Sequence, residues 1–202
     1  MRSTDYIARK LTAFMSQAYP LDSDVIRMVA ERARCYSIPR SFTLCRENEP
    51  FDKVVFVSEG IFRLSRVMNG EDHTIAFGVE GDPFISLATY LYDKPSLFSY
   101  NPVTDGEIIS VPNEDFKRLV ERTELVMWFN KVLQRQIHAL ENRWVWLGQQ
   151  DTCSRYLNLM RLRPQLMAQV PLKYIASYLG VTQSSLSRIR AQVAGKKHES
   201  VN

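Results

Sequence analysis

The spacing of hydrophobic and polar positions changes twice along the chain. Apolar residues recur every three or four positions in residues 3–18 and 21–34, which predicts two short amphipathic helices. Short apolar runs bounded by turn residues replace that pattern between residues 36 and 111, and the helical spacing returns after Pro112. The pattern therefore predicts a β-rich unit with helices on both sides of it in the sequence.

The two N-terminal helices have recognisable starts. Ser3 is a candidate N-cap for the first helix, and either Asp22 or Ser23 for the second, because short polar side chains accept hydrogen bonds from the free amides at a helix start. Tyr19-Pro20 separates the two helices, since a proline disfavours helical backbone in the residue before it.

Six runs in the middle region have the composition of β-strands. Turn signals at residues 59–60, 69–70 and 105–106 pair Glu, Asn or Asp with glycine, as tight hairpins require. Closely spaced antiparallel strands of this kind predict a roll or barrel. The runs are YSIP, FTLC, KVVFV, IFRLSRVM, HTIAFGV and GEIISV.

A long helix is predicted after Pro112, because no further glycine or proline occurs before a break expected at Gly148. The helix is either continuous or broken near Arg122-Thr123. Within it, apolar residues at spacings of four, three, four and three form one stripe, which favours a dimer seam, although packing within one chain also produces such a stripe. The stripe consists of Leu133, Ile137, Leu140, Trp144 and Leu147.

The region after Gly148 predicts further helices. The next has Tyr156, Leu157, Leu159 and Met160 as apolar positions and stops at Pro164, and another starts at Pro171. The segment IASYLGVTQSSLSRIRAQV then carries the pattern of a helix-turn-helix, in which Gly180 forms the corner and Thr182 caps the second helix. Its packing positions are Ile175, Ala176, Leu179, Val181, Leu186 and Ile189.

The second helix of this motif is polar on its other side. Arginine can donate paired hydrogen bonds to guanine and glutamine to adenine, while hydroxyls and helix N-terminal amides suit phosphate. The face fits DNA binding, with an ordinary solvated helix face as the alternative. The candidate DNA-binding residues are Thr182, Gln183, Ser184, Ser185, Ser187, Arg188 and Arg190.

Charge separates the C-terminal part from the rest. Residues 1–150 carry 18 basic and 20 acidic side chains, a net charge of −2, whereas residues 151–202 carry eight basic and two acidic, a net charge of +6. A basic module suits a polyanionic partner. The 202-residue length and 45% hydrophobic composition are typical of a soluble globular protein. With no apolar run near the roughly 20 residues of a membrane span and no signal-peptide pattern after Met1, a cytoplasmic protein is expected.

Cysteine and histidine usage predicts no cofactor and no metal. Cys35, Cys45 and Cys153 lack paired spacing, so a disulfide framework and a zinc or iron–sulfur site are not indicated. A cupin-like metal enzyme is the competing hypothesis of another class, but it needs two or three histidines on facing strands and the β-rich region contains only His73. The protein is expected not to be an enzyme.

A β-roll, a long connecting helix and the C-terminal VPLKYIASYLGVTQSSLSRIR together resemble a bacterial Crp/Fnr-type transcription regulator. The resemblance implies an α+β fold: helices and a cyclic-nucleotide-binding-like antiparallel roll (1–112), a long dimerisation helix (113–150) and a helix-turn-helix domain (151–202). It also implies a homodimer on an inverted-repeat operator, RNA polymerase as a partner, and Gln183, Ser184 and Arg188 at the base-reading positions.

The loop EGDPFISLATYLYDKPSLFSYNP departs from nucleotide-binding members of that family. Gly81-Asp82 only approximates their Gly-Glu pair, and Leu97-Phe98-Ser99 stands where the phosphate-pairing arginine is expected, so cyclic AMP binding is not predicted. Either an unknown small molecule binds a pocket containing Gly81, Asp82, Phe84, Leu97, Phe98 and Ser99, or the aromatic residues fill the interior of the roll. The aromatic residues are Phe84, Tyr90, Tyr92, Phe98 and Tyr100.

Further alternatives concern regulation and DNA contact. Haem or gas sensing through the roll requires ligands that the chain does not obviously supply. Because GKKHESVN follows Val193, the family's winged hairpin is expected to be truncated or absent, leaving Lys196 and Lys197 for loose phosphate contacts. A regulator that has lost DNA affinity and acts through protein contacts is also consistent with the pattern.

Overall fold

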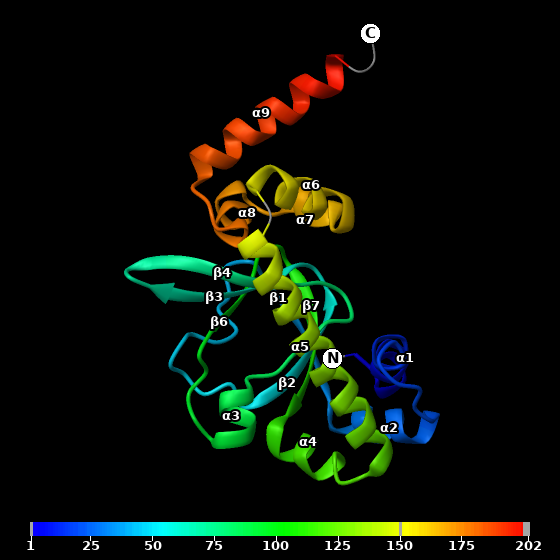
Figure 1. Cartoon of the computed structure of the whole chain (residues 1–202). Coiled ribbons are helices and arrows are strands. Elements are labelled where there is room, and N and C mark those ends of the chain that lie inside the picture. The colour runs from blue at the N-terminus through cyan, green and yellow to red at the C-terminus, as the bar shows by residue number, and fades with distance from the viewer. Residues whose placement is uncertain (1, 150, 200–202) are drawn as a thin grey trace.

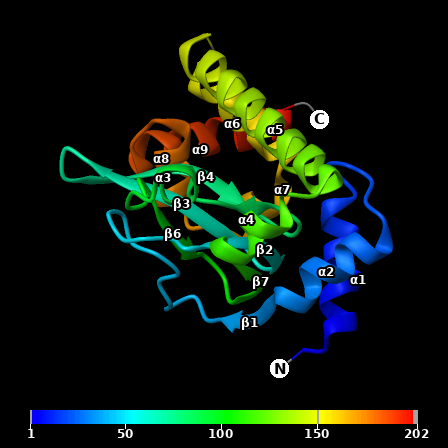
Figure 2. The same ribbon diagram turned by 90° about the horizontal axis from the view of Figure 1, so that it is seen from below.

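The computed structural model describes residues 2–149 and 151–199, with residues 149 and 194–199 described by their backbone only. A β-roll lies at the centre of the molecule, with the N-terminal helices on one side and the last four helices beyond one end of the sheets (Figure 1). The view from below shows helix α5 running along the roll from the N-terminal helices toward the last four helices (Figure 2). The predicted α+β class is confirmed.

The two N-terminal helices form where the sequence predicts them. They are α1 (Thr4–Met15) and α2 (Ser23–Arg32). The Ser3 hydroxyl accepts a hydrogen bond from the amide of Tyr6, as an N-cap does, at 3.2 Å. Asp22 occupies the N-cap position of α2 without a side-chain hydrogen bond.

The roll consists of two antiparallel sheets, with strand orders β1-β7-β2-β5 and β4-β3-β6. Five of the six predicted runs form strands. FTLC was wrongly predicted, because Cys45 makes a single bridge to Tyr100 and the run has no continuous partner strand. The elements are β1 (Arg34–Ile38), β2 (Lys53–Glu59), β3 (Phe62–Met68), β4 (Glu71–Gly78), β5 (Pro83–Phe84), α3 (Leu87–Tyr92), β6 (Ser99–Pro102) and β7 (Gly106–Pro112).

Aromatic side chains fill the interior of the roll. Phe51 stacks on Tyr100 with ring centroids 4.4 Å apart, and the Phe84 ring meets Tyr100 edge-on at 5.5 Å. Gly78 is required here, since a Cβ at that position would lie 2.2 Å from the Phe84 ring. The interior is therefore occupied by packed rings, with Phe62 beside Phe84.

A second core joins the roll to α1, α2, α4 (Asn113–Leu119) and the first half of α5 (Thr123–Gln149). Trp128 is buried in it, and its indole N–H donates to the carbonyl of Met15. Of the two alternatives for the long helix, the structure has the one with a break near Arg122-Thr123. The predicted break at Gly148 is wrong, because α5 continues through this residue. A single glycine destabilises a helix by only about 1 kcal/mol.

The remaining helices are α6 (Thr152–Leu162), α7 (Pro164–Gln169), α8 (Leu172–Leu179) and α9 (Gln183–Glu199). Asp151 caps α6 by accepting from the amides of Cys153 and Ser154. Pro164 ends α6 as predicted but also opens α7, a short helix that the sequence did not separate. No helix in the described ranges is long and apolar enough to span a bilayer.

Candidate nucleic-acid interface

A tight corner joins α8 to α9. Gly180 adopts φ +73°, a left-handed conformation that residues with a Cβ resist, and its amide donates to the carbonyl of Ser177. Two residues later, the Thr182 hydroxyl accepts from the amide of Ser185 at 3.2 Å and so caps α9. The corner glycine and the threonine cap predicted from the sequence are both present.

The apolar residues of the two helices pack on each other and on α6 and α7. Ile175, Ala176, Leu179 and Leu186 are buried. Val181 and Ile189 are partly buried against the same cluster. These are the six positions that the sequence pattern selects, and they hold α9 across α8 as a helix-turn-helix.

Helix α9 projects away from the rest of the molecule, beyond α8 (Figure 1). Ser185 is half-buried and accepts a hydrogen bond from the Thr182 hydroxyl, so its side chain takes part in the cap. The other six candidate DNA-binding side chains are exposed: Thr182, Gln183, Ser184, Ser187, Arg188 and Arg190. Lys196 and Lys197, the predicted tail contacts, lie outside the described side chains.

Helix α8 docks on the β3–β4 hairpin of the roll. The amide of Thr74 donates to the hydroxyl of Ser177 at 2.8 Å. The Arg63 guanidinium lies 4.0 Å from the Tyr174 ring centroid and pairs with Asp72 at 2.6 Å. The helix-turn-helix is therefore attached to the roll by polar and cation–π contacts and by apolar packing, in which the Phe77 and Tyr178 rings lie 5.3 Å apart. These contacts were not predicted from the sequence.

Arg63 shows why this docking is hidden in the sequence. Arg63 and Ser65 alternate with Phe62 and Leu64 along β3, a pattern that in isolation predicts a solvent-facing polar side. In the structure Arg63 and Ser65 are 5% and 3% exposed, while Phe62 and Leu64 pack in the aromatic core. Nothing local in the sequence marks the polar side of β3 as covered.

Arg143 of α5 is a second contact that sequence reasoning missed. Its guanidinium donates to the carbonyls of Thr74 and Tyr178 and lies 4.3 Å from the Tyr178 ring centroid. The other terminal nitrogen, Nη1, is buried and has no hydrogen-bond partner among the described residues. One arginine thus links the connecting helix, the roll and α8.

The apolar stripe on α5 changes its surroundings along the helix. Leu133 is partly buried against the core of its own chain. Ile137, Leu140 and Trp144 are 57%, 61% and 84% exposed, and Leu147 is 38% exposed beside Gly180. Four of the five stripe residues therefore expose apolar surface.

The residues of the candidate effector pocket differ in their surroundings and burial. Phe84 is buried and Phe98 partly buried in the aromatic core, whereas Leu97 is half exposed. The Ser99 hydroxyl accepts from the amide of Glu47. Gly81 and Asp82 form the turn before β5, where the Asp82 carboxylate accepts from the amide of Val79.

The aromatic residues of this loop divide among three environments. Tyr100 lies with Phe84 in the interior of the roll. Tyr90 packs in the other core against Phe116 and Phe129, and Tyr92 is exposed at the surface. In the filled-core interpretation, Phe84, Phe98 and Tyr100 are the residues that occupy the roll.

The thiols and the imidazole of the roll belong to Cys35, Cys45 and His73. Burial raises the pKa of both Cys35 and Cys45 to about 11, which keeps their thiols protonated. His73 lies 3.9 Å from Glu71 near the surface. Within the described part of the chain, no three His, Cys, Asp or Glu side chains are grouped closely enough to hold a metal ion.

Comparison with known proteins supports the fold. Residues 35–123 match the family model of the cyclic nucleotide-binding domain. FixK2 from Bradyrhizobium japonicum superposes with a TM-score of 0.71 at 19% identity, covering 82% of this chain and 86% of that one. CLP, a c-di-GMP-responsive global regulator of Xanthomonas campestris, has a TM-score of 0.72 at 12% identity, with coverages of 87% and 93%.

The catabolite activator protein of Thermus thermophilus is a third neighbour, with a TM-score of 0.56 at 17% identity and coverages of 89% and 86%. Among curated protein sequences, none matches this chain significantly. Residues 35–123 therefore resemble a cyclic nucleotide-binding domain, and the chain shares its overall fold with these regulators. The resemblance indicated by the sequence is confirmed.

Proposed function

We propose that this protein is a cytoplasmic, non-enzymatic transcription regulator that binds DNA through α9. The main support is the α8–α9 helix-turn-helix, in which Thr182 caps α9. It exposes Gln183, Ser184 and Arg188 on a helix that projects from the molecule. Such a helix fits the major groove, where arginine and glutamine distinguish guanine and adenine. The net charge of +6 in residues 151–202 favours the phosphate backbone.

The protein acts as a homodimer joined along the second half of α5. Ile137, Leu140 and Trp144 expose large apolar surfaces on one side of this helix, and a partner helix would bury them. Two α9 helices related by a two-fold axis read an inverted repeat whose half-sites lie about 10 to 10.5 base pairs apart. RNA polymerase is the expected downstream partner.

Cyclic AMP is not the effector. The interior of the roll is occupied by Phe51, Phe84 and Tyr100, and Leu97-Phe98-Ser99 supplies no cation for a buried phosphate. Calorimetric titration with cyclic AMP and cyclic GMP should show no binding at micromolar concentrations. A dissociation constant in the micromolar range would instead place a nucleotide in the roll, with Lys94 as the candidate cation for its phosphate.

The deciding experiment is recovery and sequencing of genomic fragments bound by the purified protein, followed by gel shifts on the shared site. We expect an inverted repeat and an affinity that falls steeply with salt. Arg188→Ala should cost about 1 to 3 kcal/mol on this site and relax preference at one base pair. Arg161→Ala removes an equal charge from an exposed position on α6 and is the matched control.

Unchanged affinity and base preference in Arg188→Ala would refute α9 as the recognition helix. Failure to enrich any genomic fragment would favour the alternative of a regulator that acts through protein contacts.

A further inference from the structure

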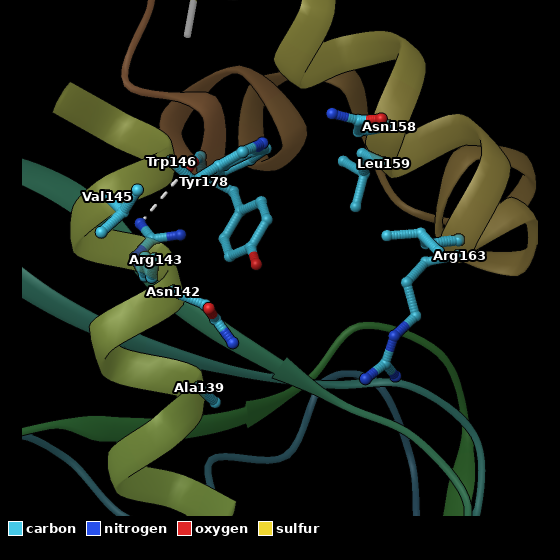
Figure 3. A pocket seen from close by; sticks show the side chains of 10 residues that line it. Ala139, Asn142, Arg143, Val145, Trp146, Asn158, Leu159, Arg163 and Tyr178 are labelled. Carbon is cyan, nitrogen blue, oxygen red and sulfur yellow. Dashed lines mark hydrogen bonds between the residues drawn. The ribbon is translucent and has the colours of Figure 1, made fainter. Parts of the chain in front are cut away.

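A cleft with a volume of about 470 Å³ lies between α5, α6 and α8, outside the roll (Figure 3). Pockets for small ligands have about this size. The side chains of Asn142 and Tyr178 point into the open space, and the lining comes from the connecting helix, from the helix after it and from the helix-turn-helix. The lining residues are Ala139, Asn142, Arg143, Val145, Trp146, Asn158, Leu159, Leu162, Arg163 and Tyr178.

The lining is cationic. Arg143 and Arg163 contribute two positive charges, and none of the described lining residues carries a carboxylate. The buried Nη1 of Arg143 has no hydrogen-bond partner among the described residues, and an unpaired buried donor of a charged group is destabilising. The charge of the lining therefore favours an anionic ligand.

The Asp82 carboxylate of the roll lies within electrostatic range of Arg163 and would compete with a bound anion for it. Arg163 extends toward the strands below it (Figure 3), and its positive charge acts on Asp82. Burial raises the pKa of Asp82, while the Val79 amide and the Arg163 charge lower it. No ion pair within 4.0 Å joins Arg163 to an acidic side chain of the described residues, so the guanidinium is open to a closer carboxylate.

The walls of the cleft suit a flat apolar group. The Trp146 and Tyr178 rings lie 5.7 Å apart and are tilted by 46°. Leu159 and Leu162 of α6 face the same space. Aromatic and aliphatic walls with a few polar groups are the usual lining of a site for a small organic molecule.

A partner protomer at the α5 seam leaves this cleft accessible. Asn142 follows Leu140 by two residues, which places the two side chains about 200° apart around the helix. The seam and the cleft therefore occupy opposite sides of α5.

We propose that this cleft binds a small aromatic carboxylate, whose ring packs on Tyr178 and Trp146 and whose carboxylate is held by Arg163. Such a ligand would touch α5, α6 and α8 together. If the proposed DNA-binding function holds, a ligand bridging these helices favours one orientation of the helix-turn-helix relative to α5 and so changes the separation of the two α9 helices.

The test is calorimetric titration of the full-length protein with benzoate, 4-hydroxybenzoate, phenylacetate and indole-3-carboxylate, with benzamide as the neutral comparison. We expect at least one carboxylate to bind with a dissociation constant below about 1 mM, and benzamide about tenfold more weakly. Because no DNA is present, this result does not depend on the regulator proposal, which the gel shift tests separately.

Three variants locate the site. Arg163→Gln should weaken carboxylate binding about tenfold, whereas Arg161→Gln, an equal charge change two residues away on α6, should leave it unchanged. Asp82→Asn should tighten binding severalfold, since it removes the competing carboxylate while an amide oxygen can still accept from Val79. A gain in affinity cannot result from misfolding.

No binding by any of the four carboxylates below about 1 mM, or equal binding of benzamide, would overturn the ligand class. Equal losses in Arg163→Gln and Arg161→Gln, or no gain in Asp82→Asn, would overturn the location.

Discussion

The two halves of α5 have the same helical geometry and opposite surroundings. In the first half Leu125, Trp128 and Val132 are at most 5% exposed, because α1, α2 and α4 cover them. In the second half Ile137 and Trp144 are more than half exposed, although they are equally apolar. The apolar stripe of one continuous helix thus lies in a protein core at its start and on the surface at its end, where another side of the helix contacts α8 through Arg143 and Trp146.

This difference teaches that an apolar stripe on a helix does not reveal what covers it. The first half buries its apolar stripe within the chain, where burial of a large side chain contributes about 1.5 to 3 kcal/mol to the free energy of unfolding. The second half extends past the roll, and its exposed stripe is the reason for proposing a partner protomer. The comparison can be tested by changing equivalent residues on the two sides of this boundary.

The largest expected effect compares Trp128→Ala with Trp144→Ala. The first change removes a ring that is 1% exposed and its hydrogen bond to Met15, and should lower the free energy of unfolding by about 3 to 5 kcal/mol. The second removes a ring that is 84% exposed and should alter it by less than about 0.5 kcal/mol in dilute monomer. Urea unfolding at low protein concentration measures both; similar losses would mean that the halves do not differ in this way.

The next effect concerns association. Leu140→Lys places a charge in the seam and should raise the dimer dissociation constant at least about a hundredfold, roughly 3 kcal/mol. Sedimentation over a range of concentrations measures this. His138→Lys adds a similar charge to an exposed position on another side of the same helix and is the control. An unchanged dimer in Leu140→Lys would place the interface elsewhere.

A smaller effect should appear on acidification, at Glu107 of β7, which lies near the core that covers the first half of α5. Burial alone would raise the pKa of Glu107, but hydrogen bonds from Tyr6, Ser58 and Arg2 lower it from 4.5 to about 2. Two of these donors belong to the N-terminal segment and α1, which packs on Trp128. Because the folded pKa is depressed, this stabilisation is present above about pH 5 and is lost as the pH falls toward 2.

Glu107→Gln should therefore remove about 2 kcal/mol of stability at pH 7 and flatten the loss between pH 5 and pH 2, as measured by urea unfolding. Glu80→Gln, which breaks the more exposed pair with Lys10, should keep the slope of the wild type. An unaltered slope in Glu107→Gln would show that other carboxylates control acid unfolding.

Local patterns were sufficient for most of the fold. Strand alternation, the Gly180 corner and the Ser3 cap each depend on neighbouring residues, and each was predicted. The short β5 and β6 strands and α3 were not, because two to six residues supply too few positions for a period to be recognised. FTLC failed for the opposite reason, since its composition suits a strand but tertiary structure provides only one bridging partner.

The candidate interface divides along the same line. Thr182, Arg188 and the packing residues around them lie within one short segment, so their spacing alone was enough to select them as candidates. Arg63 and Arg143 act across more than 30 residues of sequence on Tyr174, Thr74 and Tyr178, and no periodicity connects such distant partners. The cleft between α5, α6 and α8 depends on these contacts and could not be foreseen.

The three tryptophans of α5 supply optical reporters for the two proposals. Trp128 is buried in the core and Trp144 is exposed on the seam, while Trp146 lies beside Tyr178 in the cleft. Dilution into monomer would transfer Trp144 from an apolar contact to water and shift its emission to longer wavelength. An aromatic carboxylate in the cleft would act mainly on Trp146, so the intrinsic fluorescence of Trp144→Phe and Trp146→Phe separates assembly from ligand occupancy without an added label.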